Sequence, residues 1–111
     1  MPNRQYEAGD RFEKRVMNDL RRRGYVCFQT RGSKTATDII ALNPTATLLV
    51  QAKSGTTQPD HTQWNALMDL AFKAYAEPLV ADRDGRKIRY RLITGYHTFR
   101  SRHWPAEDYQ P

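Results

Sequence analysis

The order of apolar and polar side chains predicts an amphipathic helix near the start of the chain, from about residue 6 to residue 23. Its apolar positions recur at four-residue spacing: Phe12, Val16 and Leu20. Gly24 follows the last basic turn, as is typical where a helix ends. Glu13 lies at the margin of the apolar face. From spacing alone we favour an ordinary i,i+4 surface partner for Glu13, because charges at helix margins are usually solvated.

A second helix is predicted from Asp60 to about Ala76. Asp60, with Gln63 three residues later, has the pattern of a capping box, and Pro78 is expected to end the helix. The apolar face of this helix is expected to consist of six side chains: Trp64, Leu67, Met68, Ala71, Phe72 and Tyr75.

Five short runs of β-prone residues predict strands, at residues 25–28, 37–41, 47–52, 78–82 and 88–94. Turns are expected at Asn43-Pro44 and around Gly85, and a polar loop at residues 29–37. Because residues 48–50 are consecutive apolar residues, the third strand is expected to be covered on both faces. The order helix, three strands, helix, two strands predicts a small α/β fold in which helices pack on a sheet.

Three polar side chains are predicted to meet at one edge of this sheet: Asp38, Gln51 and Lys53. The second and third strands are joined by a short link, so we expect them to pair antiparallel. Side chains alternate along a strand, so Gln51 and Lys53 share a face and can lie opposite Asp38. Carboxylate and amide oxygens bind hard cations, and an ammonium stabilises developing negative charge. The stretch favours metal-assisted cleavage of a phosphodiester over a turn-capping Asp and an ordinary surface Lys.

Charge and length narrow the class of protein. The 111 residues suit one compact domain and carry a net charge of +6. The basic residues are bunched at residues 21–23, 31–34, 86–91 and 100–102. Bunched Lys and Arg favour a polyanion such as nucleic acid over a surface that is merely kept soluble by charge.

The sequence argues against several other classes. Its single cysteine, Cys27, excludes an internal disulfide and a Cys-rich zinc site, and its apolar neighbours make it a core residue. The three histidines, at positions 61, 97 and 103, are scattered and lack the spacing of a zinc site. No apolar run approaches bilayer length and no signal pattern opens the chain. We therefore expect a soluble intracellular protein with no membrane partner.

Asp38, followed by an apolar strand that ends in Gln51-Ala52-Lys53, resembles the signature of the PD-(D/E)XK nuclease superfamily. A longer series resembles the archaeal-type Holliday junction resolvases, which have relatives in viruses: Gly9-x-x-Phe12-Glu13, Leu20, Arg23-Gly24-Tyr25, Arg31-Gly32-Ser33 and Asp38-Ile39-Ile40-Ala41. This similarity extends over roughly residues 6–95. It implies a restriction-endonuclease-like fold, with a central mixed sheet of about five strands flanked by helices. It also implies a nuclease domain, residues 1–95, and a basic, aromatic C-terminal tail, residues 96–111.

The resemblance implies a role for each matching residue. Three residues stand where the family has its metal ligands: Glu13, Asp38 and Gln51. This reverses the assignment of Glu13 that spacing favours. Lys53 matches the catalytic lysine, and Ser33 and Arg31 match loop residues that act near the scissile phosphate. Basic residues would then contact DNA phosphates: Arg21, Arg22, Arg23, Arg31 and Lys34.

The activity implied by the resemblance is cleavage of four-way DNA junctions by paired symmetric nicks, in recombination, repair or viral DNA processing. It implies Mg²⁺ as cofactor, with Mn²⁺ as a substitute, a homodimer with two active sites, and no small-molecule substrate. The protein would act in the cytoplasm near the nucleoid or, if encoded by a virus, in the cytoplasm of the host.

Gln51 departs from the superfamily pattern, because most relatives carry Glu there. Its amide oxygen can bind a cation, but the site loses a negative charge, so we expect weaker metal binding, with one or two ions per site left open. Other interpretations also stay open. These are another nuclease of the same fold, such as a flap, repair, restriction-like or single-strand-specific enzyme, and a protein that binds branched DNA and whose nuclease site has decayed. An RNA-binding module is disfavoured by the covered strands.

Overall fold

The computed structural model describes residues 4–30, 35–55 and 59–111, with side chains from residue 9 onward. Within these ranges the elements are α1 (Arg4–Arg22), β1 (Val26–Gln29), β2 (Ile39–Leu42), β3 (Thr47–Lys53), α2 (His61–Ala74), β4 (Glu77–Asp84), β5 (Lys87–Ile93) and β6 (Ala106–Asp108). No helix among the described residues is long and apolar enough to cross a membrane.

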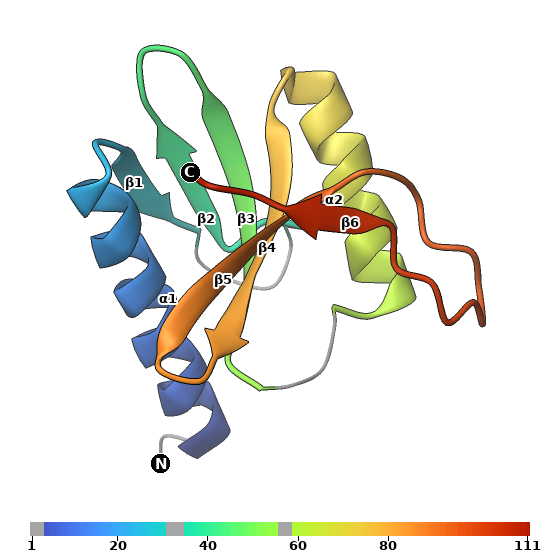
Figure 1. The fold of residues 1–111 in the computed structure, drawn as a ribbon, viewed down its shortest axis with the longest axis horizontal. Coiled ribbons are helices and arrows are strands. Elements are labelled where there is room, and N and C mark those ends of the chain that lie inside the picture. Colours follow the sequence, from blue (N-terminus) through green and yellow to red (C-terminus); the bar gives the residue numbers. More distant parts are fainter. Residues whose placement is uncertain (1–3, 31–34, 56–58) are drawn as a thin grey trace.

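The six strands form one mixed sheet in the spatial order β1-β2-β3-β4-β5-β6 (Figure 1). Strands β3 and β4 are parallel, and every other neighbouring pair is antiparallel. A parallel pair needs a crossover connection, which α2 provides. The predicted α/β class with a mixed sheet is confirmed. The expected count of about five strands missed β6, since three residues are too few to show an alternating pattern.

Two strand boundaries differ from the predicted ones, and both lie next to Asp38. Strand β1 ends at Gln29, so this residue belongs to the strand and not to the polar loop. Strand β2 begins at Ile39, so Asp38 precedes the strand instead of lying within it. The backbone N–H of Thr30 still donates to the carbonyl oxygen of Asp38, at an N–O distance of 2.9 Å. The β1–β2 pairing therefore extends to the backbone of the carboxylate residue.

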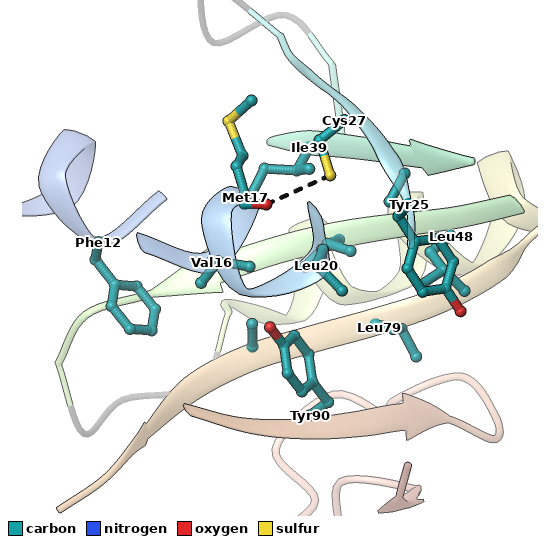
Figure 2. Close-up of a cluster of buried hydrophobic side chains, with 13 residues drawn as sticks. Phe12, Val16, Met17, Leu20, Tyr25, Cys27, Ile39, Leu48, Leu79 and Tyr90 are labelled. Carbon is teal, nitrogen blue, oxygen red and sulfur yellow. Dashed lines mark hydrogen bonds between the residues drawn. The ribbon is translucent and has the colours of Figure 1, made fainter. Parts of the chain in front are cut away.

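Helix α1 packs on one face of the sheet through the predicted apolar stripe (Figure 2). Phe12, Val16 and Leu20 are at most 1% exposed. They contact buried side chains from five strands: Cys27, Ile39, Ala41, Leu48, Val50, Leu79, Ala81 and Tyr90. Complete burial of such side chains contributes about 1.5–3 kcal/mol each. This packing fixes the position of α1, and of the polar residues at its margin, relative to the strand ends.

Helix α2 packs on the opposite face and begins with the predicted capping box. The Gln63 backbone N–H donates to Asp60 Oδ1 at 2.7 Å, and the Asp60 N–H donates to Gln63 Oε1 at 3.3 Å. Its buried residues, Trp64, Leu67 and Ala71, contact Leu49, Val80 and Ile93 of the sheet. Because Leu48 and Val50 face α1 while Leu49 faces α2, β3 is covered on both faces, as predicted.

Two residues expected on the buried face of α2 lie outside it. Phe72 is 80% exposed and Tyr75 is 97% exposed. The helix ends at Ala74, before the expected end, and Tyr75 takes the left-handed cap conformation with φ of 53°. The prediction was wrong for these two side chains because the sheet covers only the stripe centred on Trp64, Leu67 and Ala71.

The segment predicted as a tail, residues 96–111, packs on the preceding structure and supplies β6. The imidazole of His97, 5% exposed, stacks on Trp104 with ring centroids 3.6 Å apart. Its Nδ1 lies 2.8 Å from Nδ1 of His61, and its Nε2 lies 2.8 Å from the carbonyl oxygen of Ser101. Two histidines that are scattered in the sequence thus meet. Among the described residues, however, no three His, Cys, Asp or Glu side chains are grouped to hold a metal.

Candidate active site

Asp38 lies where β1 ends, β2 begins and β3 ends. Its backbone N–H donates to the carbonyl oxygen of Val50 at 2.9 Å. Its carboxylate Oδ2 accepts the backbone N–H of Ala52, also at 2.9 Å. Val50 and Ala52 are the two neighbours of Gln51, so these bonds hold Asp38 beside that residue. A residue that disfavours strands is therefore accommodated here because its side chain binds the adjacent strand.

Gln51 and Lys53 lie at the end of β3, on one face because side chains alternate. Gln51 is buried and Lys53 is half-buried. Burial raises the pKa of Asp38, while the hydrogen bond from Ala52 and the positive charge of Lys53 oppose that rise. The structure thus brings together the three residues that the sequence placed at one edge of the sheet.

Glu13 reaches this end of the sheet from α1. Partial burial raises the pKa of its carboxyl group, the hydrogen bond from Gln29 lowers it, and the charges of Asp38 and Asp10 raise it further. The net shift is upward. The charge of Asp38 contributes to this upward shift, so Asp38 is close enough to act electrostatically on the Glu13 carboxyl group. Glu13 is therefore not the ordinary solvated residue that its spacing favours.

Gln29 and Asp10 also lie next to Glu13, although neither was predicted from the sequence as a site residue. The side-chain nitrogen of Gln29 lies 2.6 Å from Glu13 Oε2 and 3.0 Å from Asp10 Oδ1. Lys14 forms an ion pair with Asp10 at 3.0 Å. The i,i+3 spacing of Asp10 and Glu13 is a signal that could have been read from the sequence. The contact with Gln29, 16 residues from Glu13, could not.

The donor set suits a hard divalent cation. Glu13 and Asp38 offer carboxylate oxygens, and Gln51 offers a neutral amide oxygen, all ligands of the kind that Mg²⁺ binds. The raised pKa of Glu13 reflects burial and crowding of negative charge, which a cation bound between the carboxylates would relieve. Because no three Asp, Glu, His or Cys side chains of the described residues are grouped to hold a metal, such a cation would have two carboxylates and the amide of Gln51 as its donors.

Asp82 is another buried carboxylate near the site, but basic side chains already bind it. It lies beside Lys53 in the β3–β4 register. Both of its oxygens accept from Arg89, at 2.9 and 2.8 Å, and Oδ2 also accepts from Arg91 at 3.1 Å. Asp82 is therefore engaged by two guanidinium groups and is a poor replacement for the carboxylate that Gln51 lacks.

The remaining predicted site residues fall into two groups. Arg31, Ser33 and Lys34 lie outside the described residues. Arg21 to Arg23 lie at the C-terminal end of α1, and the helical rise puts Arg21 about 12 Å along the axis from Glu13. Arg22 and Arg23 form ion pairs with Asp19 at 3.4 and 3.0 Å. The structure therefore does not bring these three arginines to Asp38.

A mixed sheet between two helices, with two carboxylates and a lysine at one end, is the architecture of a PD-(D/E)XK nuclease. The model of the archaeal Holliday junction resolvase (Hjc) family matches residues 4–101. Among solved structures, the chain is similar to Archaeoglobus fulgidus Hjc, a Holliday junction resolvase from an archaeal hyperthermophile. The TM-score is 0.65 and the identity 26%, over 74% of this chain and 70% of that one. No curated protein matches the chain. The chain belongs to the archaeal Holliday junction resolvase family.

Proposed function

We propose that the protein is a divalent-cation-dependent endonuclease that resolves four-way DNA junctions by paired nicks. The observation that carries this proposal is the hydrogen bond that holds the Asp38 carboxylate at the end of β3, beside Gln51 and Lys53. Membership of the resolvase family supports a junction as the substrate. The net charge of +6 supports a nucleic-acid partner.

Each side chain of the site has a chemical task in this proposal. Asp38 and Glu13 supply charged oxygen ligands for Mg²⁺ or Mn²⁺, and Gln51 supplies a neutral one. When bound, the cation polarises the scissile phosphate and makes water a better nucleophile. The ammonium group of Lys53 stabilises the negative charge that develops on the phosphate oxygens. The half-buried position of Lys53 strengthens this stabilisation, because water screens the charge less.

Basic residues outside the metal site are proposed to hold the DNA backbone. Arg31 and Ser33 would act next to the scissile phosphate, and Lys34 would contact a phosphate nearby. Residues 21–23 would contact a more distant part of a DNA arm, since they lie at the far end of α1. Phosphate contacts fix the position of DNA without reading its sequence, which suits recognition of a branched shape.

We further propose a two-fold homodimer, because symmetric cleavage of a junction requires two active sites. The candidate surface lies at the C-terminal end of α2. Phe72 and Tyr75 are exposed there, and Phe72 lines an apolar groove of about 360 Å³ with Met68, Pro78 and Ile93. Exposed apolar surface of this kind favours a protein contact.

Phe72→Glu is expected to make the protein monomeric, because it places a charge in the proposed apolar interface. Light scattering after size-exclusion chromatography would measure the mass. Ala66→Glu adds the same charge at an exposed position on another side of α2 and should leave the dimer intact. A wild-type monomer at micromolar concentration, or a dimeric Phe72→Glu variant, would contradict the proposed interface.

The proposed substrate is tested by comparing labelled four-way junction, flap and linear duplex DNA, each with Mg²⁺, Mn²⁺ or EDTA. Cutting of the junction alone, and only with a divalent cation, would support a resolvase. Preferential cutting of flap or linear DNA would instead favour another nuclease of the same fold.

Gln51 favours one second candidate, a protein that binds branched DNA through a decayed nuclease site. Gln51→Glu restores the missing charge, and we expect it to raise the affinity for Mn²⁺ about tenfold and to speed cleavage at limiting cation. Titration of Mn²⁺ and single-turnover cleavage measure the two effects. If both wild type and Gln51→Glu bind junctions tightly and neither cuts, the decayed-site interpretation replaces the proposed one.

A further inference from the structure

We propose that Gln29 is a positioning residue for the active site, acting through Glu13. This inference rests on the proposed function. Gln29 ends β1, and its side chain reaches back to α1, where its nitrogen bridges Glu13 and Asp10. The contact joins the sheet to the helix carboxylate that completes the site.

The chemistry of the contact fixes the orientation of the Gln29 amide. Ionised carboxylates only accept hydrogen bonds, so the amide nitrogen, with its two N–H groups, must face Glu13 and Asp10. A single nitrogen can thus donate one N–H to each carboxylate, at 2.6 and 3.0 Å. Hydrogen bonds to ionised acceptors are stronger than neutral ones. The amide therefore limits the rotamers that Glu13 can adopt.

The backbone of β1 fixes the position of the Gln29 side chain relative to the other carboxylate residue, Asp38. Gln29 pairs with Ile39 in the β1–β2 register, and the next residue, Thr30, donates its N–H to the carbonyl oxygen of Asp38. The hydroxyl of Thr30 also donates to the carbonyl oxygen of Thr37 at 2.6 Å. Gln29 is thus built on the strand that holds Asp38, and it orients Glu13 relative to that residue.

A neutral donor has a particular advantage at this position. Glu13 and Asp38 carry like charges, which oppose their approach to each other. The Gln29 amide counters this by donating a hydrogen bond to Glu13 Oε2, which holds the carboxylate in place. It adds no positive charge that would compete with a divalent cation. Outer-shell donors of this kind typically tune metal affinity by about 10–100-fold.

The alternative is that Gln29 merely helps α1 to pack on β1. Gln29→Met keeps the length and much of the volume of the side chain but removes the donor. Positioning through Glu13 predicts that this variant binds Mn²⁺ about tenfold more weakly and has a lower kcat, with an unchanged KM for junction DNA. A role in packing alone would lower the melting temperature and leave Mn²⁺ affinity unchanged.

A double-mutant cycle with Glu13→Gln tests the coupling directly. Mn²⁺ titrations of the free protein, followed by electron paramagnetic resonance, would be made on wild type, both single variants and the double variant. We expect Gln29→Met to weaken Mn²⁺ binding in the wild-type background and to add nothing once Glu13 is replaced. Gln29→Asn shortens the side chain by one methylene, so its amide no longer reaches Glu13 and Mn²⁺ binding should weaken to the same extent. This variant replaces Gln29→Met in the cycle if Gln29→Met does not fold.

Two results would overturn the inference while leaving the proposed nuclease standing. One is that wild-type protein cuts junctions and that Gln29→Met has the same Mn²⁺ affinity and the same kcat as wild type. The other is a loss from Gln29→Met that is as large in the Glu13→Gln background as in wild type. A wild-type protein that neither binds Mn²⁺ nor cuts DNA would overturn the proposed function and this inference together.

Discussion

Replacing Asp38 by Asn is expected to abolish junction cleavage and to leave junction binding nearly unchanged. The amide oxygen of Asn can still accept the N–H of Ala52, so the local fold should persist. The negative charge that we propose to hold the cation is lost, however. Loss of an outer-shell partner of a metal already costs about 10–100-fold, so loss of a direct ligand should cost more than about a hundredfold in cleavage rate.

Single-turnover cleavage and gel-shift titration in EDTA would measure the two properties separately. Asp84→Asn is a matched control, because it removes the same charge at an exposed position of β4. It should cut at the wild-type rate. Retained cutting by Asp38→Asn would remove Asp38 from the metal site.

The second large effect concerns stability. Trp64→Ala is expected to lower the free energy of unfolding by about 3–5 kcal/mol, as for other large core residues. Trp64 is fully buried, its indole N–H donates to the carbonyl oxygen of Gly95 at 3.0 Å, and its ring contacts Trp104. The variant therefore leaves a cavity under α2 and loosens the attachment of the C-terminal segment.

Urea unfolding followed by far-UV circular dichroism would measure the loss. Phe72→Ala removes another aromatic side chain of the same helix, but Phe72 is 80% exposed, so the stability of the monomer should change by less than about 1 kcal/mol. Equal losses for the two variants would contradict the observed packing of α2 on the sheet.

The centre of the site could be predicted because its geometry is local in the sequence. Asp38, Gln51 and Lys53 lie on two strands joined by one short turn, so alternation and antiparallel pairing are enough to bring them together. The burial of β3 on both faces was visible in its three consecutive apolar residues. The start of α2 was visible in the capping box of Asp60 and Gln63.

Other features depend on contacts between segments that are distant in the sequence. Glu13 approaches the proposed site only because α1 packs on one face of the sheet, and its helical spacing pointed to solvent. The bridge from Gln29 and the pairing of His61 with His97 have no local signal. The exposure of Phe72 likewise depends on where the sheet ends, which periodicity does not report. Resemblance to a family pointed Glu13 toward the site where spacing did not, and its role there stays a prediction.

The most direct test of the central claim is to map the nicks that wild-type protein makes in a four-way junction labelled in turn on each strand. Reactions would contain Mg²⁺ or EDTA. A pair of nicks at symmetric positions in opposing strands, present with Mg²⁺ and absent with EDTA, is the predicted result. Nicks that persist in EDTA would contradict the metal site, and nicks scattered over all four strands would contradict the paired action of a two-fold resolvase.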